Sequence, residues 1–188
     1  MPKKENKNEV PSLKLYIDTC IFQGALSQRS EEDTIFMNKI NEKNWEVYTS
    51  IHTLMELFDI AKERKFLMKS VIDNWIDTNT FTRGRGKMNL TITDLDDVTN
   101  NLNNFFLQHK KITLISLEEV VWDDVKWIVE KSNLHSSDAL HLSLAWMYDC
   151  DKLVTHDEFF IKEGNKLLSK VKKTGKLKIC DVSKVEVK

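Results

Sequence analysis

The 188-residue chain has only two prolines and five glycines, the residues that interrupt regular structure, and only three cysteines. So few chain-breaking residues exclude a long Gly- or Pro-rich linker, and the sequence contains no internal repeat. A chain of this length is long enough for one domain with a full hydrophobic core but short for two such domains. We therefore expect a single domain over residues 12–188.

The cysteines also exclude several kinds of site. Cys20, Cys150 and Cys180 are odd in number, widely spaced and form no CxxC or Cys/His metal pattern, so reduced thiols are expected. No apolar run approaches the roughly 18 residues that a membrane span needs. Residues 1–11 (MPKKENKNEVP) lack the apolar centre of a signal peptide and are predicted to be a disordered lead-in. These features favour a cytoplasmic protein without membrane contact.

The chain has no large excess of either charge, because 28 Lys and Arg residues nearly balance 29 Asp and Glu residues. The distribution is uneven, however. Residues 118–158 contain ten acidic residues and three lysines, whereas residues 162–188 contain nine lysines and three acids. This pattern suits a metal site beside a phosphate-binding surface, but charge alone favours the simpler explanation of two solvated helix faces.

Short strand patterns alternate with helical patterns along the chain. We predict strands at residues 13–18, 45–49, 111–116, 152–155 and 176–182. Helical periodicity occupies residues 31–41 and begins again near residues 54, 94, 121 and 136. The fold class is therefore α/β, with a mainly parallel sheet of four to five strands covered by helices on both faces.

Four carboxylates follow this pattern. Asp18 ends the first strand, and Asp157 lies just past the fourth. Glu56 lies on the helix after the second strand, and Asp138 lies in the first turn of the helix before the fourth. Functional groups gather at the carboxyl ends of parallel strands. Carboxylates packed closely there repel each other unless a cation is bound, and oxygen ligands favour Mg²⁺ or Mn²⁺.

Each acid also has a structural interpretation. Asp18 could cap the turn after its strand, and Asp157 could be the N-cap of a helix starting at residue 158. Residues 53–56 (TLME) match a capping box, which would explain Glu56. Asp138 could simply favour the positive end of its helix. The combination of four acids, rather than any one of them, indicates a site.

At these residues the chain resembles the PIN-domain nucleases, including the VapC-like toxins of type II toxin–antitoxin modules. The four matching segments are residues 15–19 (LYIDT), 50–57 (SIHTLMEL), 137–145 (SDALHLSLA) and 153–160 (LVTHDEFF). Their order is that of the family, and the resemblance extends from about residue 13 to residue 160. It implies a PIN-like three-layer α/β/α fold.

The resemblance also implies an activity. Asp18, Glu56, Asp138 and Asp157 would be the catalytic acids of an endoribonuclease that depends on Mg²⁺ or Mn²⁺, and the three aspartates would hold the ion. Thr19 and Thr155 would support them through hydrogen bonds. The expected partners are an RNA substrate, an antitoxin protein and a second copy of the chain.

One departure concerns spacing. Glu56 and Asp138 are 82 positions apart, more than the compact toxins usually have, which indicates a helical or loop extension at about residues 75–111. Arg83, Arg85 and Lys87 within it could hold the RNA backbone, or could belong to a solvated loop. The departure affects the expectation of a toxin more than that of a nuclease.

Two alternatives within the fold remain: a stand-alone PIN nuclease of RNA processing or decay, and a catalytically silent scaffold that binds RNA or protein. A haloacid-dehalogenase-type phosphatase also begins with a strand ending in Asp. That family needs a second Asp two positions later, where this chain has Cys20, so we exclude it.

Overall fold

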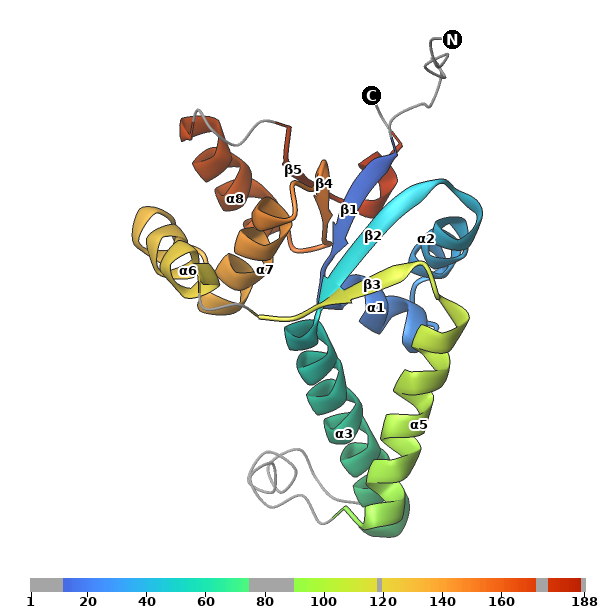
Figure 1. The fold of residues 1–188 in the computed structure, drawn as a ribbon. Coiled ribbons are helices and arrows are strands. Elements are labelled where there is room, and N and C mark those ends of the chain that lie inside the picture. Colours follow the sequence, from blue (N-terminus) through green and yellow to red (C-terminus); the bar gives the residue numbers. More distant parts are fainter. Residues whose placement is uncertain (1–11, 75–89, 118–119, 172–175, 187–188) are drawn as a thin grey trace, which may run out of the picture.

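The computed structural model describes residues 12–74, 90–117, 120–171 and 176–186 (Figure 1). Its sheet has five strands, all parallel, in the order β3-β2-β1-β4-β5. The strands are β1 (Leu13–Ile17), β2 (Trp45–Ser50), β3 (Ile112–Ile115), β4 (Lys152–Val154) and β5 (Lys178–Cys180). The predicted α/β class and parallel sheet are confirmed.

Seven α-helices lie within the described residues. They are α1 (Thr19–Leu26), α2 (Glu31–Glu42), α3 (Ile51–Asn74), α5 (Ile92–Gln108), α6 (Val120–Lys131), α7 (Ser136–Met147) and α8 (Glu158–Lys170). None of these described helices is both long enough and apolar enough to cross a membrane.

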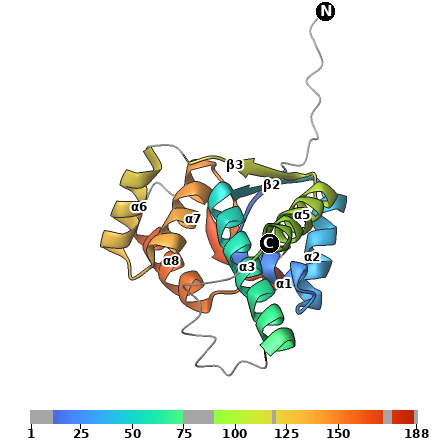
Figure 2. The ribbon, with the colours of Figure 1, turned by 90° about the horizontal axis from the view of Figure 1, so that it is seen from below.

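The alternation of β1 divides the core into two layers. Leu15 and Ile17 pack on one face of the sheet with α1, α2, α3 and α5, whereas Tyr16 packs on the other with α6, α7 and α8. Figures 1 and 2 show these two groups of helices on opposite sides of the strands. Because both faces are covered, the central strand β1 is fully buried at Leu15, Tyr16 and Ile17, as is typical of a parallel sheet. The three-layer arrangement is therefore that of the sequence prediction.

Helix α1 was not predicted. Its eight residues include a glycine and β-branched side chains, which weaken the helical pattern. The helix forms because Asp18 caps its first turn and because Ile21, Phe22 and Ala25 are buried against the sheet.

Helices α3 and α5 extend together away from the sheet (Figure 1). Lys65 pairs with Asp97 at 2.9 Å and Lys69 pairs with Asp94 at 2.7 Å across the two helices. Helix α5 begins at Ile92, capped by Thr91, slightly before the predicted start at Asp94. It occupies the second half of the expected extension.

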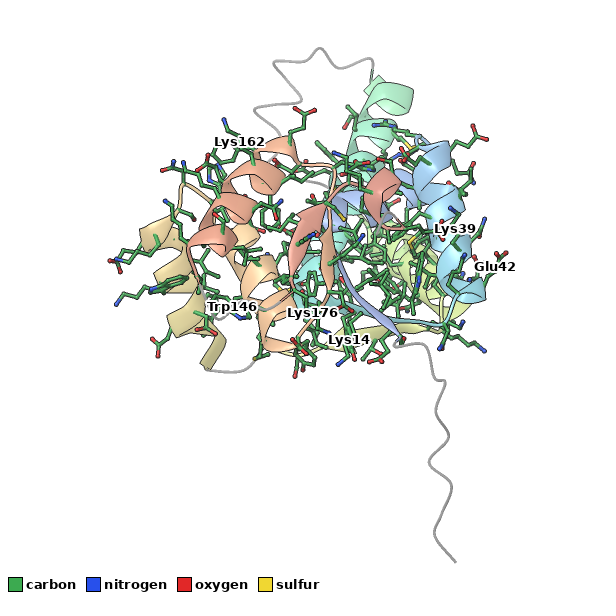
Figure 3. All side chains as sticks on the ribbon, turned by 90° about the horizontal axis from the view of Figure 1, so that it is seen from above. Lys14, Lys39, Glu42, Trp146, Lys162 and Lys176 are labelled. Carbon is green, nitrogen blue, oxygen red and sulfur yellow. The ribbon has the colours of Figure 1, made fainter. Side chains whose placement is uncertain are left out.

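Two predicted features lie outside the described residues. The first is the lead-in at residues 1–11, and the second is the basic segment with Arg83, Arg85 and Lys87. Elsewhere the outer faces of the helices carry charged side chains, among them Lys39 and Glu42 on α2 and Lys162 on α8 (Figure 3).

The parallel strands place their carboxyl ends at one edge of the sheet. Beyond the strands themselves, the Asp18 backbone N–H donates to the Val154 carbonyl at 3.0 Å. The Thr155 N–H likewise donates to the Cys180 carbonyl at 3.0 Å. These bonds hold Asp18, which follows β1, against the end of β4, and Thr155, which follows β4, against the end of β5. This edge carries the predicted acids.

Substitution of Gly24 by alanine tests the packing of α1 against α2. The new Cβ would lie 1.8 Å from Asp33 Oδ2. Asp33 is 1% exposed, and its other carboxylate oxygen lies 2.6 Å from His156 Nε2, so it cannot withdraw without losing that contact. We expect Gly24→Ala to lower the free energy of unfolding by about 1–3 kcal/mol, despite the better helix propensity of alanine.

Urea denaturation measures this change, and Gln23→Ala on the exposed side of α1 is the matched control. Equal stability of the two variants would contradict the predicted close contact.

Candidate functional site

Asp18 lies at the centre of the carboxyl edge and is 8% exposed. As the N-cap of α1, it accepts a hydrogen bond from the Thr19 backbone N–H at 2.7 Å through Oδ1. Its Oδ2 accepts from Thr155 Oγ1 at 2.7 Å and from Cys20 Sγ at 3.1 Å. The capping role considered from the sequence is therefore real, and it coexists with a position inside the acidic cluster.

Cys20 contributes as a hydrogen-bond donor. Burial, together with the charge of Asp18, raises the pKa of the Cys20 thiol to about 12. It is therefore protonated at neutral pH and a weak nucleophile. Cys20, Cys150 and Cys180 are all free thiols, as expected.

Glu56 is held by four side chains. Thr19 Oγ1 donates to its Oε2 at 2.5 Å, and Ser137 Oγ donates to its Oε1 at 2.6 Å. His141 Nε2 lies 3.1 Å from Oε2, and His52 Nε2 lies 3.4 Å from Oε1. Burial alone would raise the pKa of Glu56, but these hydrogen bonds outweigh burial and hold the pKa far below its usual range. Glu56 is therefore a firmly ionised carboxylate.

The capping-box interpretation of Glu56 is wrong. Helix α3 begins at Ile51, and its first turn is closed by Ser50, whose Oγ accepts from the Thr53 backbone N–H at 3.3 Å. Thr53 is therefore already inside the helix, and the Glu56 side chain is bound to residues of α1 and α7 instead.

His141 connects two of the acids and was not predicted to belong to the site. It is 1% exposed, with Nε2 facing both Glu56 and Asp18 Oδ1, the latter at 3.4 Å. Its Nδ1 lies 3.0 Å from the Tyr16 hydroxyl, which in turn donates to Ser50 Oγ at 3.0 Å. Burial lowers the pKa of His141, but Glu56 and Asp18 raise it by more, so the net shift is upward.

The sequence did contain a signal for both histidines. His141 is three residues after Asp138, and His52 is four residues before Glu56, so in a helix each shares a face with its acid.

Asp138 differs from the other acids because, in the described part of the chain, no hydrogen bond holds its carboxylate; only the charges of His141 and His135 act to lower its pKa. Among the described residues, no hydrogen bond or ion pair reaches its side chain, although it is about half-buried. Burial raises the pKa of the Asp138 carboxyl, and the negative charges of Asp157 and Asp18 raise it further. A bound cation would remove this repulsion, so the oxygen-rich set fits a hard divalent ion.

Asp157 lies at the exposed margin of the cluster. It is the N-cap of α8, where its Oδ1 accepts from the Phe160 N–H at 2.8 Å. Its own backbone N–H donates to Thr155 Oγ1 at 3.1 Å. The structure thus brings Asp18, Asp138 and Asp157 within electrostatic reach of one another, and joins Glu56 to Asp18 through Thr19.

His156 fixes the loop that carries Thr155 and Asp157. Its Nε2 lies 2.6 Å from Asp33 Oδ1 on α2, and its Nδ1 lies 2.7 Å from Asp181 Oδ2 after β5. Through its two ring nitrogens, His156 joins three separate segments of the chain.

No protein-family model matches the chain, and no curated protein matches it in sequence. Solved structures do match its fold. A structure of VapBC2 from Rickettsia felis bound to a promoter DNA fragment has a TM-score of 0.56 at 13% identity. DNA-bound VapBC from Salmonella typhimurium has a TM-score of 0.53 at 12% identity, and FitAcB from Neisseria gonorrhoeae 0.52 at 11%. Each match covers 90% of this chain and 98% of the other.

The chain has a VapC-like PIN fold. The four segments that resemble PIN motifs lie on the elements where that resemblance expects them, from β1 to the start of α8. At 11–13% identity the matches establish this PIN-like fold and leave the chemistry to the site itself.

The contacts of His156 predict a pH dependence of stability. Burial lowers its pKa, but hydrogen bonds to Asp181 and Asp33 raise it above the ordinary 6.5. A raised folded-state pKa means that the stabilising contribution is complete below about pH 6.5 and is lost as the pH rises through the folded-state pKa. We expect His156→Gln to remove this part of the pH dependence, measured as the free energy of unfolding on both sides of that range.

His135→Gln, at an exposed histidine before α7, is the control and should keep the wild-type profile. Parallel pH profiles for wild type and His156→Gln would show that the Asp33–His156–Asp181 contacts make no pH-dependent contribution to stability.

Proposed function

We propose that the chain is a Mg²⁺- or Mn²⁺-dependent endoribonuclease in which Asp18, Asp138 and Asp157 hold the ion. The observation that carries the proposal is the side chain of Asp138. A half-buried carboxylate without a described hydrogen-bond partner, raised in pKa by two neighbouring acids, is costly unless a cation binds there. The PIN-like fold and the four motifs support hydrolysis of RNA as the reaction.

The oxygen ligands favour Mg²⁺ or Mn²⁺ over softer ions. Such an ion, when bound, polarises a phosphodiester and lowers the pKa of a water molecule. Thr155 supports the arrangement by donating to Asp18 and by accepting from the Asp157 backbone, so one hydroxyl fixes two of the proposed ligands. Thr19 holds Glu56 in the same manner.

Glu56 is suited to orienting the attacking water rather than to deprotonating it. A general base works best when its pKa is near the working pH, whereas four donors hold the pKa of Glu56 far below. The ionised carboxylate therefore serves as a fixed hydrogen-bond acceptor. For the RNA backbone, Arg83, Arg85 and Lys87 remain the proposed contacts.

We infer that the biological setting is a type II toxin–antitoxin module, in which an antitoxin protein covers the site and two copies of the chain pair. The support is the fold shared with VapBC and FitAcB complexes. A stand-alone RNA-processing nuclease and a silent scaffold are the alternatives. A small neighbouring gene for a DNA-binding protein would favour the toxin, whereas failure to bind Mn²⁺ in calorimetry would favour the scaffold.

Removal of one ligand tests the proposed reaction. We expect Asp138→Asn or Asp18→Asn to lower the rate of Mg²⁺-dependent RNA cleavage by roughly 100-fold or more, because several kcal/mol of transition-state stabilisation would be lost. Cleavage of a labelled single-stranded RNA measures the rate, and circular dichroism shows whether the fold survives.

Asp59→Asn is the matched control, because Asp59 is exposed on α3 and pairs with Lys62 outside the cluster. It should leave cleavage unchanged. Full activity in excess EDTA, or in folded Asp138→Asn, would overturn the proposal.

A further inference from the structure

Three side chains beside the aspartates form a second potential ligand set. Each of His52, Glu56 and His141 offers one nitrogen or carboxylate oxygen, and these atoms all lie within 4.8 Å of one another. His52 and Glu56 come from successive turns of α3, and His141 comes from α7. The set therefore depends on the packing of these two helices.

The distances suit direct coordination of one ion. Ligands about 2.0–2.1 Å from a tetrahedral metal lie about 3.3 Å from each other. His52 Nε2 lies 3.4 Å from Glu56 Oε1, and His141 Nε2 lies 3.1 Å from Glu56 Oε2. These two distances reach different oxygens of Glu56, and a shared ion would draw the three ligand atoms, which lie within 4.8 Å of one another, closer together.

The donor atoms select the kind of ion. Imidazole nitrogens suit Zn²⁺ and related transition metals, whereas Mg²⁺ prefers oxygen ligands and bound water. Two histidines and one glutamate are a known ligand set for zinc with one position left open. We propose that His52, Glu56 and His141 bind a transition-metal ion of the Zn²⁺ class, through ligands other than Asp18, Asp138 and Asp157 but directly beside Asp18.

The surroundings support this assignment. Metal-bound histidines usually hydrogen-bond through their second nitrogen, and His141 Nδ1 lies 3.0 Å from the Tyr16 hydroxyl. Thr19 and Ser137 hold the Glu56 carboxylate, so its orientation is fixed before an ion arrives. The side chains of His52 and Glu56 are 24% and 29% exposed, which gives an ion access from solvent.

The competing explanation is a hydrogen-bonded cluster without metal. In that cluster Ser137 Oγ lies 3.0 Å from His52 Nε2 and donates to Glu56, so it links the two side chains.

Titration of the whole chain with Zn²⁺ by calorimetry separates the two explanations, with excess Mg²⁺ present to occupy the aspartates. Loss of a residue that only supports a metal ligand typically weakens metal binding about 10- to 100-fold. We expect His52→Gln, which removes a ligand itself, to weaken Zn²⁺ binding at least as much. Because His52 is partly exposed, this variant should fold normally.

His135→Gln is the matched control and should bind Zn²⁺ like wild type. Co²⁺ provides a second signal, because nitrogen coordination with few ligands gives stronger visible absorption than an all-oxygen site, and this absorption should be lost in His52→Gln. Equal Zn²⁺ affinity of His52→Gln and His135→Gln, or an all-oxygen Co²⁺ spectrum in wild type, would overturn the proposal.

The proposed Zn²⁺ site and the proposed nuclease site share Glu56, but the two proposals can fail separately. Asp138→Asn should keep the Co²⁺ absorption while it loses cleavage. If that variant keeps cleavage and His52→Gln still loses Zn²⁺, the nuclease proposal alone fails. If cleavage is lost in Asp138→Asn and Zn²⁺ binding is unaffected in His52→Gln, the histidine site alone fails.

Discussion

Negative charge concentrated at the carboxyl edge of the sheet is the constraint on which the arrangement of the site depends. Parallel strands bring this edge together, and the chain compensates the acids there in different ways. Asp18 is compensated by hydrogen bonds from Thr19, Cys20 and Thr155. Glu56 is compensated by hydroxyls and by His141. Asp138 has no hydrogen-bond partner among the described residues, so its negative charge is the one that a bound cation would compensate.

The short strands β4 and β5 must hold this edge in place with three residues each. Backbone hydrogen bonds alone give little rigidity to a loop after so short a strand. The bridge from Asp33 through His156 to Asp181 adds contacts to α2 and to the segment after β5. His156 therefore has a positional role. It anchors the loop that carries the proposed ligand Asp157 and the Thr155 hydroxyl, which donates to the proposed ligand Asp18.

The sequence predicted the sheet and the strand-end acids well, because apolar strands and their polar ends are local patterns. Asp18 is the clearest case. The sequence could not predict those features of the site that depend on contacts between residues distant in the chain. The 53–56 pattern suggested a cap, since spacing does not reveal that Ser50 closes the first turn of α3. His52 and His141 could not be assigned, because the meaning of each depends on α3 packing beside α7.

Glu56 connects the two halves of the site, and its position has a chemical consequence. Its Oε2 faces Thr19 and His141, and its Oε1 faces Ser137 and His52. A carboxylate that coordinates an ion between the histidines cannot at the same time present both oxygens to a water molecule near Asp18. Occupation of the histidine site would therefore oppose hydrolysis at the aspartates, because the two proposed sites share this one side chain.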